Sequence, residues 1–227
     1  MDGHQGYGVG GAAVKVRTSI HPQRTPEWFA DRLGRVTGSA CSAVFAKSRT
    51  KGEESSERKK YRLQLALERI TGNPGGSVYV NAAMQRGIDL EPVAVAAYEA
   101  AAGELVDVPG FMFAEELLVG ASLDGICGSW GEGALEVKCP DSVTHLEYLR
   151  EGRLPPAYVP QVTHNLWVSG REWLDFVSFD DRFPEPLRLF RVRVTRNELD
   201  IDGHMVAVCK FLDEVDLEVS KVKELMR

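Results

Sequence analysis

The stretch that decides the fold is residues 117–140, LLVGASLDGICGSWGEGALEVKCP. One apolar run ends at Asp124-Gly125, and a second, from Ala134, carries Glu136 and Lys138 two positions apart. Successive side chains of a strand point to opposite faces, so Glu136 and Lys138 share one face. Gly125 permits a sharp turn, and a hairpin would place Asp124 beside Glu136. This stretch therefore predicts two strands that bring two carboxylates and a lysine together.

The rest of the chain alternates helical and strand-like patterns. Apolar spacing, capping residues and Gly or Pro stops predict helices over 26–33, 57–71, 81–103, 141–151 and 155–169, and from 197 onward, with a further helix start at 37–40 leading into 41–46. Short β-prone runs predict strands over 105–108, 111–113, 117–122, 134–138, 173–179 and 187–194. The fold class is therefore α/β (α+β), with a central mixed β-sheet flanked by helices.

Composition bounds the organisation of the chain. With 227 residues and 44% hydrophobic content, residues 21–227 are predicted to form a single domain, and the Gly-rich residues 1–20 a flexible tail. The net charge of −6 is the wrong sign for a protein that coats nucleic acid, although a local basic groove remains compatible with it. The four cysteines form no C-x-x-C pair, and no apolar run spans a membrane. We expect a cytoplasmic protein.

The cluster of Asp124, Glu136 and Lys138 favours metal-dependent phosphate chemistry. Two adjacent carboxylates repel each other unless a cation lies between them, and oxygen ligands without Cys or His favour magnesium or manganese over zinc. Such an ion polarises a phosphate and acidifies water, and Lys138 would orient that water or accept its proton. Glu-x-Lys also arises by chance on solvated strand faces, and Asp-Gly is an ordinary turn. The triplet alone therefore leaves both readings open.

With its neighbours, the stretch resembles the bacteriophage lambda exonuclease family, the YqaJ-type viral recombinases, which are restriction-endonuclease-like PD-(D/E)xK nucleases. The motifs that carry the resemblance are 122–125 and 135–140, together with the blocks 28–39, 86–91 and 158–161 and Trp167. Several blocks in one order are more specific than any single motif.

The resemblance implies a role for each matching residue. Asp124, Glu136 and the Val137 carbonyl would bind the metal, two magnesium or manganese ions per site, and Lys138 would be the catalytic lysine. The helix-borne Glu91 and Gln161 would complete the catalytic set.

A 5′-phosphate pocket is implied at Arg32, Ser39 and Ser122, whose guanidinium and hydroxyls suit an anion. The alternatives are a salt-bridge partner for Arg32 and a helix cap for Ser39. His164 departs from the aromatic residue expected at its position and is assigned to the core or to a supporting shell.

The implied activity is a Mg-dependent 5′-to-3′ exonuclease. It would degrade one strand of linear duplex DNA to mononucleotides and leave a 3′ single strand for phage recombination by annealing. A ring-shaped homotrimer, a phage single-strand annealing protein as partner and a phage or prophage origin in a bacterial host follow from the same resemblance. Further DNA contacts are predicted at Lys47, Arg49, Lys51 and Tyr158. The alternatives are an endonuclease of the same fold and an inactive DNA-binding recombination protein.

Overall fold

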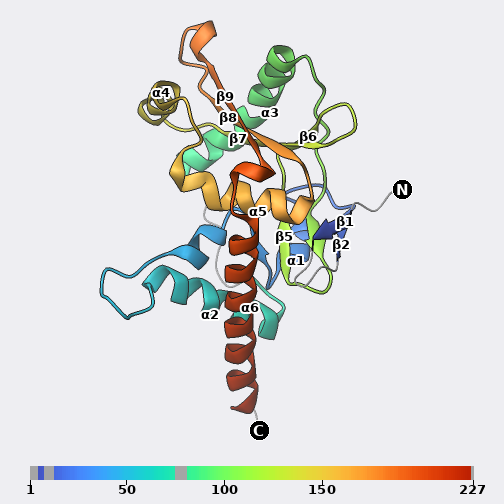
Figure 1. The fold of residues 1–227 in the computed structure, drawn as a ribbon, viewed down its shortest axis with the longest axis vertical. Coiled ribbons are helices and arrows are strands. Elements are labelled where there is room, and N and C mark those ends of the chain that lie inside the picture. The colour runs from blue at the N-terminus through green and yellow to red at the C-terminus, as the bar shows by residue number, and fades with distance from the viewer. Residues whose placement is uncertain (1–4, 8–12, 75–80, 226–227) are drawn as a thin grey trace.

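The computed structural model describes residues 5–7, 13–74 and 81–225, and their strands form two mixed β-sheets (Figure 1). The first sheet has the order β1-β2-β4-β5-β3, with β1 Gln5–Tyr7, β2 Ala13–Thr18, β4 Met112–Ala114, β5 Val119–Ala121 and β3 Val36–Thr37. The second has the order β6-β7-β8-β9, with β6 Gly125–Cys127, β7 Gly133–Lys138, β8 Trp173–Phe179 and β9 Leu189–Thr195. Each sheet contains one parallel pair, β3 with β5 and β7 with β8. The α/β class is confirmed, but the predicted single central sheet is two sheets.

The helices begin and end where capping chemistry predicts. They are α1 Pro26–Arg32, α2 Ser56–Thr71, α3 Ala82–Ala102, α4 Ser142–Glu151, α5 Val159–Ser169 and α6 Ile201–Glu224, with 3₁₀ turns η1 Cys41–Phe45, η2 Pro156–Tyr158, η3 Glu185–Leu187 and η4 Arg196–Glu198. Thr25 caps α1 by accepting from the Trp28 N–H, and Asn81 caps α3 by accepting from the Met84 N–H. Left-handed glycines end α2, α3, α4 and α5.

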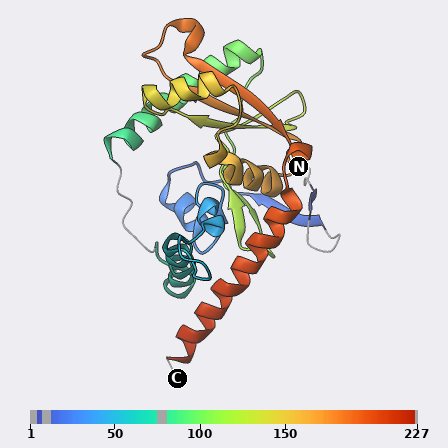
Figure 2. The same ribbon diagram turned by 60° about the vertical axis from the view of Figure 1, so that its left-hand side comes forward.

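Helix α5 lies between the two sheets (Figures 1 and 2). It packs against β4 and β5 of the first sheet and β8 of the second, and against α6. Residues 162–169 are all buried, as expected for a helix that is covered on every side. The long helix α6 continues away from the sheets, and its distal part packs against α2. Polar side chains of α5 therefore lie inside the molecule, where each needs a partner.

The strand β7 divides its side chains between two cores. Leu135 and Val137 pack with Ala94 and Tyr98 of α3. The opposite face belongs to the larger core, which contains Ala134 of β7 and several α5 residues. Glu136 and Lys138 therefore leave β7 on the α5 side, as the alternation predicts.

Three sequence predictions need correction. Residues 105–108 form no strand and contribute only a bridge between Asp107 and Ile126. The helix start at 37–40 is instead strand β3 followed by the 3₁₀ turn η1. The predicted tail ran to residue 20, whereas residues 13–18 form β2, which pairs with β4 through Val16 and Ala114. Val16 packs on the main core, and this long-range contact outweighs local composition. The remaining tail residues 1–4 and 8–12 lie outside the described part.

No helix in the described ranges is long and apolar enough to cross a lipid bilayer.

Candidate active site

The hairpin β6–β7 brings Asp124 beside Glu136, which is the predicted placement, although the predicted hairpin partner, the strand at 117–122, lies in the other sheet as β5 and β6 takes its place. The Asp124 N–H donates to the Leu135 carbonyl at 3.1 Å, and the Val137 N–H donates to Asp124 Oδ2 at 2.7 Å. The first bond fixes the Asp124 backbone just before β6, and the second fixes its side chain. Because Val137 lies between Glu136 and Lys138, the same contacts hold Asp124 against both.

Helix α5 holds the Glu136 carboxylate through two amides. Gln161 Nε2 donates to Oε1 at 2.6 Å, and Asn165 Nδ2 donates to Oε2 at 2.9 Å. Gln161 and Asn165 are one helical turn apart, so both face β7. Glu136 is 1% exposed, and a buried carboxylate without such donors would be costly. The contact between Gln161 and Glu136 agrees with the predicted place of this glutamine.

The Lys138 ammonium also donates to Glu136 Oε1, and it lies 5.4 Å from the centre of the Tyr158 ring. Burial lowers the pKa of Lys138, but the carboxylates of Glu136 and Asp124 outweigh burial, so the net pKa is above its ordinary value. Without a bound cation, Lys138 is therefore charged and acts as a donor.

Glu91 on α3 lies close enough to Asp124 to raise its pKa. Its carboxylate accepts from Arg24 Nη2 at 2.5 Å. Arg86 anchors helix α3 to the second sheet. It donates to the Asp180 carboxylate, which follows β8, at 3.1 Å, and to the Pro140 carbonyl, which follows β7, at 3.4 Å. Glu91 therefore acts on Asp124 through its charge while it is paired with Arg24, and its assisting role at the site stays a prediction.

The donor set fits a divalent cation of the magnesium class. Burial raises the pKa of Asp124, and the Glu136 and Glu91 carboxylates add to this effect, while Lys138 opposes it. Glu91 is paired with Arg24, so the one ammonium of Lys138 faces the two carboxylates of Asp124 and Glu136, and a hard cation between these carboxylates would remove their repulsion. The oxygen-only set of Asp124 and Glu136, together with the Val137 carbonyl, suits magnesium or manganese rather than zinc.

The predicted phosphate pocket is brought together from α1, the segment before η1 and the end of β5. Arg32 Nη1 donates to Ser122 Oγ at 2.6 Å, and Nη2 donates to Ser39 Oγ at 3.4 Å. The guanidinium lies 4.2 Å from the Trp28 ring centre. Partial burial lowers the pKa of Arg32 to about 10, so the group stays cationic. Arg32 and Ser39 line a cavity of about 840 Å³ that also includes Arg35 and Lys60.

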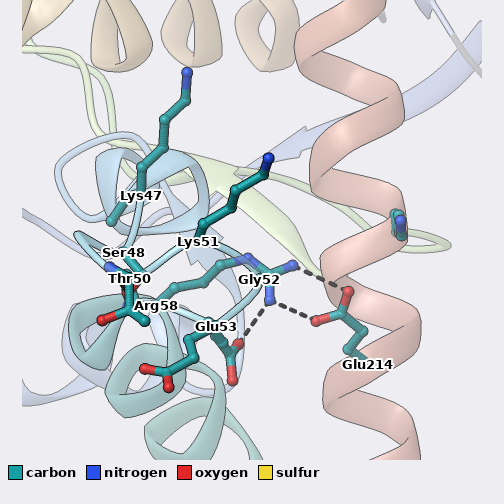
Figure 3. A pocket seen from close by; sticks show the side chains of 12 residues that line it. Lys47, Ser48, Thr50, Lys51, Gly52, Glu53, Arg58 and Glu214 are labelled. Atoms are coloured by element: carbon teal, nitrogen blue, oxygen red, sulfur yellow. Dashed lines mark hydrogen bonds and ion pairs between the residues drawn. The ribbon is translucent and has the colours of Figure 1, made fainter.

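Of the other predicted DNA contacts, the basic loop residues lie apart from the carboxylate site, and Tyr158 lies beside Lys138 within it. Lys47 and Lys51 line a cavity of about 490 Å³ with Lys210 of α6, and their side chains extend from the loop in one direction (Figure 3). Neither forms an ion pair within the described residues, whereas Arg58 below them is paired with Glu54 and Glu214. Arg49 belongs to the same loop and does not line this cavity. Tyr158, by contrast, packs 5.0 Å from the Phe176 ring, next to Lys138.

Sequence reasoning missed three supporting residues. Asn165, four positions after Gln161, could have been found as a second amide on the same face of this helix. Gln23 Nε2 donates to the Leu123 carbonyl at 2.8 Å, immediately before Asp124, and no pattern indicates this. Arg24 is the one described non-glycine residue with positive φ, at 71°. His164 was assigned to the core or a supporting shell, and the structure buries it completely.

Residues 27–172 match the family model of the YqaJ-like viral recombinase domain. The solved alkaline exonuclease LHK-Exo from Laribacter hongkongensis is 37% identical over 89% of this chain and 98% of that chain, with a TM-score of 0.78. LHK-Exo in complex with dAMP has the same identity and coverage and a TM-score of 0.80. A phage-related exonuclease from Haemophilus somnus 129PT, 17% identical over 81% and 96% of the two chains with a TM-score of 0.57, supports the fold alone. No curated protein sequence matches. The predicted restriction-endonuclease-like fold is thereby confirmed, and a nuclease role is supported.

Proposed function

The chain belongs to the YqaJ-like viral recombinase family, and on this basis we propose that it is a metal-dependent exonuclease that degrades linear duplex DNA from a 5′ end. The polarity rests on the resemblance of Arg32, Ser39 and Ser122 to a 5′-phosphate pocket, and the spacing of this pocket from the carboxylates supports it. Ser122, bonded to Arg32 at 2.6 Å, lies two residues before Asp124. Two residues span at most about 7 Å. A terminal phosphate held by Arg32 would therefore place the adjoining phosphodiester bond at the carboxylate group.

In the proposed mechanism, Asp124, Glu136 and the Val137 carbonyl would hold magnesium or manganese, two ions per site, as the family resemblance implies. When bound, the metal polarises the scissile phosphate and lowers the pKa of an attacking water. Gln161 and Asn165 keep Glu136 in place through their two amide contacts. The Lys138 ammonium donates to a phosphate oxygen or orients the water, and Glu91 assists from α3. These roles are the ones that the family resemblance implies, and the contacts of Glu136 with Gln161 and Lys138 support them.

The products and partners are part of the same proposal. The dAMP bound by the relative LHK-Exo is a deoxynucleoside monophosphate, which supports release of mononucleotides here. A homotrimeric ring would keep a negatively charged chain on the strand it encircles, and the remaining 3′ strand would pass to a phage annealing protein. Equilibrium sedimentation that returned only monomer would remove the ring from the proposal.

The decisive assay compares three duplexes in Mg²⁺: linear with 5′-phosphates, linear with 5′-hydroxyls, and a covalently closed circle. Label at the 5′ end should leave the phosphorylated linear duplex as mononucleotide before label at the 3′ end, and chelation should stop the reaction. The circle should remain intact. Early release of the 3′ label would overturn the polarity. Nicking of the circle would instead support an endonuclease of the same fold.

A further inference from the structure

A cluster of nitrogen and sulfur ligands lies inside the molecule, separate from the carboxylates. Cys41 begins η1, His164 is in the middle of α5, and His204 is in the first turns of α6. The Cys41 Sγ and one ring nitrogen from each histidine all lie within 4.8 Å of one another. Cys41 and His164 are fully buried, and His204 is 6% exposed. The fold thus brings together three metal-binding side chains from three elements.

The hydrogen bonds of His164 leave one ring nitrogen directed at the cluster. Its Nε2 lies 3.2 Å from the Gly120 carbonyl, which can only accept, so Nε2 carries the proton. Nδ1 then accepts the 3.1 Å hydrogen bond from His204 Nε2, and a bound ion would take the place of that His204 proton. A metal-binding histidine commonly donates its other N–H to a backbone carbonyl, which fixes the ring orientation. His164 already has this arrangement.

The spacing and protonation of the two rings suit a tetrahedral ion. Two nitrogens bound to zinc at about 2.0–2.1 Å are separated by about 3.3 Å, close to the 3.1 Å found here. Burial lowers the pKa of His164 to about 3 and that of His204 to about 4, so both rings are neutral, the form that binds metal. The Cys41 thiol donates to the Gly38 carbonyl at 3.1 Å and would turn inward to bind.

The charges around the cluster bear on the protonation of its ligands. A thiolate and two neutral imidazoles around a divalent ion leave one net positive charge. The Asp200 carboxylate, which caps α6, acts electrostatically on His204. Burial and the Glu136 carboxylate raise the pKa of the Cys41 thiol, so this thiol would give up its proton only to a bound ion. Trp167, whose ring centre lies 6.0 Å from that of His204, lines a cavity of about 450 Å³ with Asp200 and Met205, and none of the three proposed ligands lines it.

We infer that Cys41, His164 and His204 form a buried three-ligand site for one zinc-class ion, chemically distinct from the carboxylate site. One sulfur and two nitrogens select zinc or cobalt over magnesium. The ion would tie η1 and α6 to α5, the helix whose Gln161 and Asn165 hold Glu136. This inference rests on the cluster itself and stands whether or not the exonuclease proposal is correct.

The test uses cobalt because thiolate coordination has its own optical signature. The full chain, freed of metal with a chelator, is titrated with Co²⁺ in the presence of excess Mg²⁺, which occupies the oxygen site. We expect one equivalent to produce a thiolate-to-cobalt charge-transfer band, and Zn²⁺ to abolish it. Cys41→Ser should remove the band, and Cys209→Ser, at a half-buried cysteine of α6, should retain it. Zn²⁺ should raise the melting temperature of the wild type and not that of Cys41→Ser.

A second variant guards against loss of folding. His204→Gln changes the least buried ligand and should weaken Zn²⁺ binding at least about a hundredfold, which metal analysis after dialysis measures directly. Circular dichroism establishes that each variant is folded. Absence of the band in the wild type, or its persistence in Cys41→Ser, would overturn the inference and leave a hydrogen-bonded pair of neutral histidines.

Discussion

The catalytic group and the Arg32 pocket are adjacent and hold opposite excesses of charge. Asp124 and Glu136 share the one ammonium of Lys138, whereas the third carboxylate, Glu91, is paired with Arg24. In the pocket, Arg32 donates to two hydroxyls, and Glu68 lines the same cavity as Arg35 and Lys60. The first region therefore attracts a cation, and the second attracts an anion. A DNA end and its metal supply both, which makes each region testable separately.

The largest expected effect comes from reducing the negative charge of the catalytic group. Asp124→Asn keeps the size of the side chain but removes a proposed metal ligand and the charge that attracts the ion. We expect single-turnover hydrolysis of a 5′-phosphorylated duplex to fall about a thousandfold or more, with DNA affinity in chelator retained. Asp89→Asn, at an exposed position of α3, is the matched control. A comparable loss in Asp89→Asn would contradict the assignment.

A smaller loss of hydrolysis is expected when Asn165, which holds Glu136, is displaced while the carboxylates themselves are unchanged. A Cβ at Gly38 would lie 2.1 Å from Asn165 Oδ1, so Gly38→Ala must push Asn165 away from Glu136. We expect hydrolysis to fall about 10- to 100-fold, with a higher Mg²⁺ requirement, the size of effect known for outer contacts of metal ligands. In an Asn165→Ala background, Gly38→Ala should add little. Additive losses would mean that Gly38 acts by another route.

A substitution in the Arg32 pocket should change the preference for phosphorylated ends rather than the hydrolysis step itself. Arg32→Lys keeps the positive charge but loses the two-pronged geometry. We expect kcat/KM on 5′-phosphorylated ends to fall about tenfold or more, since charged hydrogen bonds contribute about 1.5–3 kcal/mol. Activity on 5′-hydroxyl ends should change little, and that substrate is the internal control. Equal losses on both substrates would show that Arg32 supports the fold rather than the terminal phosphate.

Much of the catalytic group follows from sequence, and its supports do not. Alternation along β7 places Glu136 and Lys138 on one face, and helical spacing places Gln161 toward them, because both depend on local geometry. The contact of Gln23 with the Leu123 carbonyl joins residues that are 100 positions apart. Strand β2 was missed for the same reason, since its partner β4 is distant in the chain. Local patterns indicate faces, and tertiary packing decides which faces meet.

Two substitutions of Arg24 separate the effect of its backbone strain from the effect of its charge on Glu91. Its φ of 71° is unfavourable for a residue with a side chain, and its guanidinium holds Glu91. Arg24→Gly and Arg24→Ala both lose the contact with Glu91, so both should shift the Mg²⁺ dependence of hydrolysis equally, by a few-fold. The free energy of unfolding of Arg24→Gly, measured by chemical denaturation, should be about 1 kcal/mol higher than that of Arg24→Ala, because glycine adopts a positive φ without strain. Equal stabilities would show that the chain relaxes at this position.

The smallest effect is expected in the loop that carries Lys47, Arg49 and Lys51, which lies apart from both the carboxylate site and the Arg32 pocket. Lys47 and Lys51 extend together and lack carboxylate partners among the described residues. If the loop contacts the DNA backbone, each replacement by Ala should reduce the salt dependence of DNA affinity, log Kd against log salt, by about 0.9. The cleavage rate at saturating DNA should not change. Unchanged slopes in all three variants would remove the loop from the DNA interface, and basic charge at the Arg32 pocket would then have to account for end binding on its own.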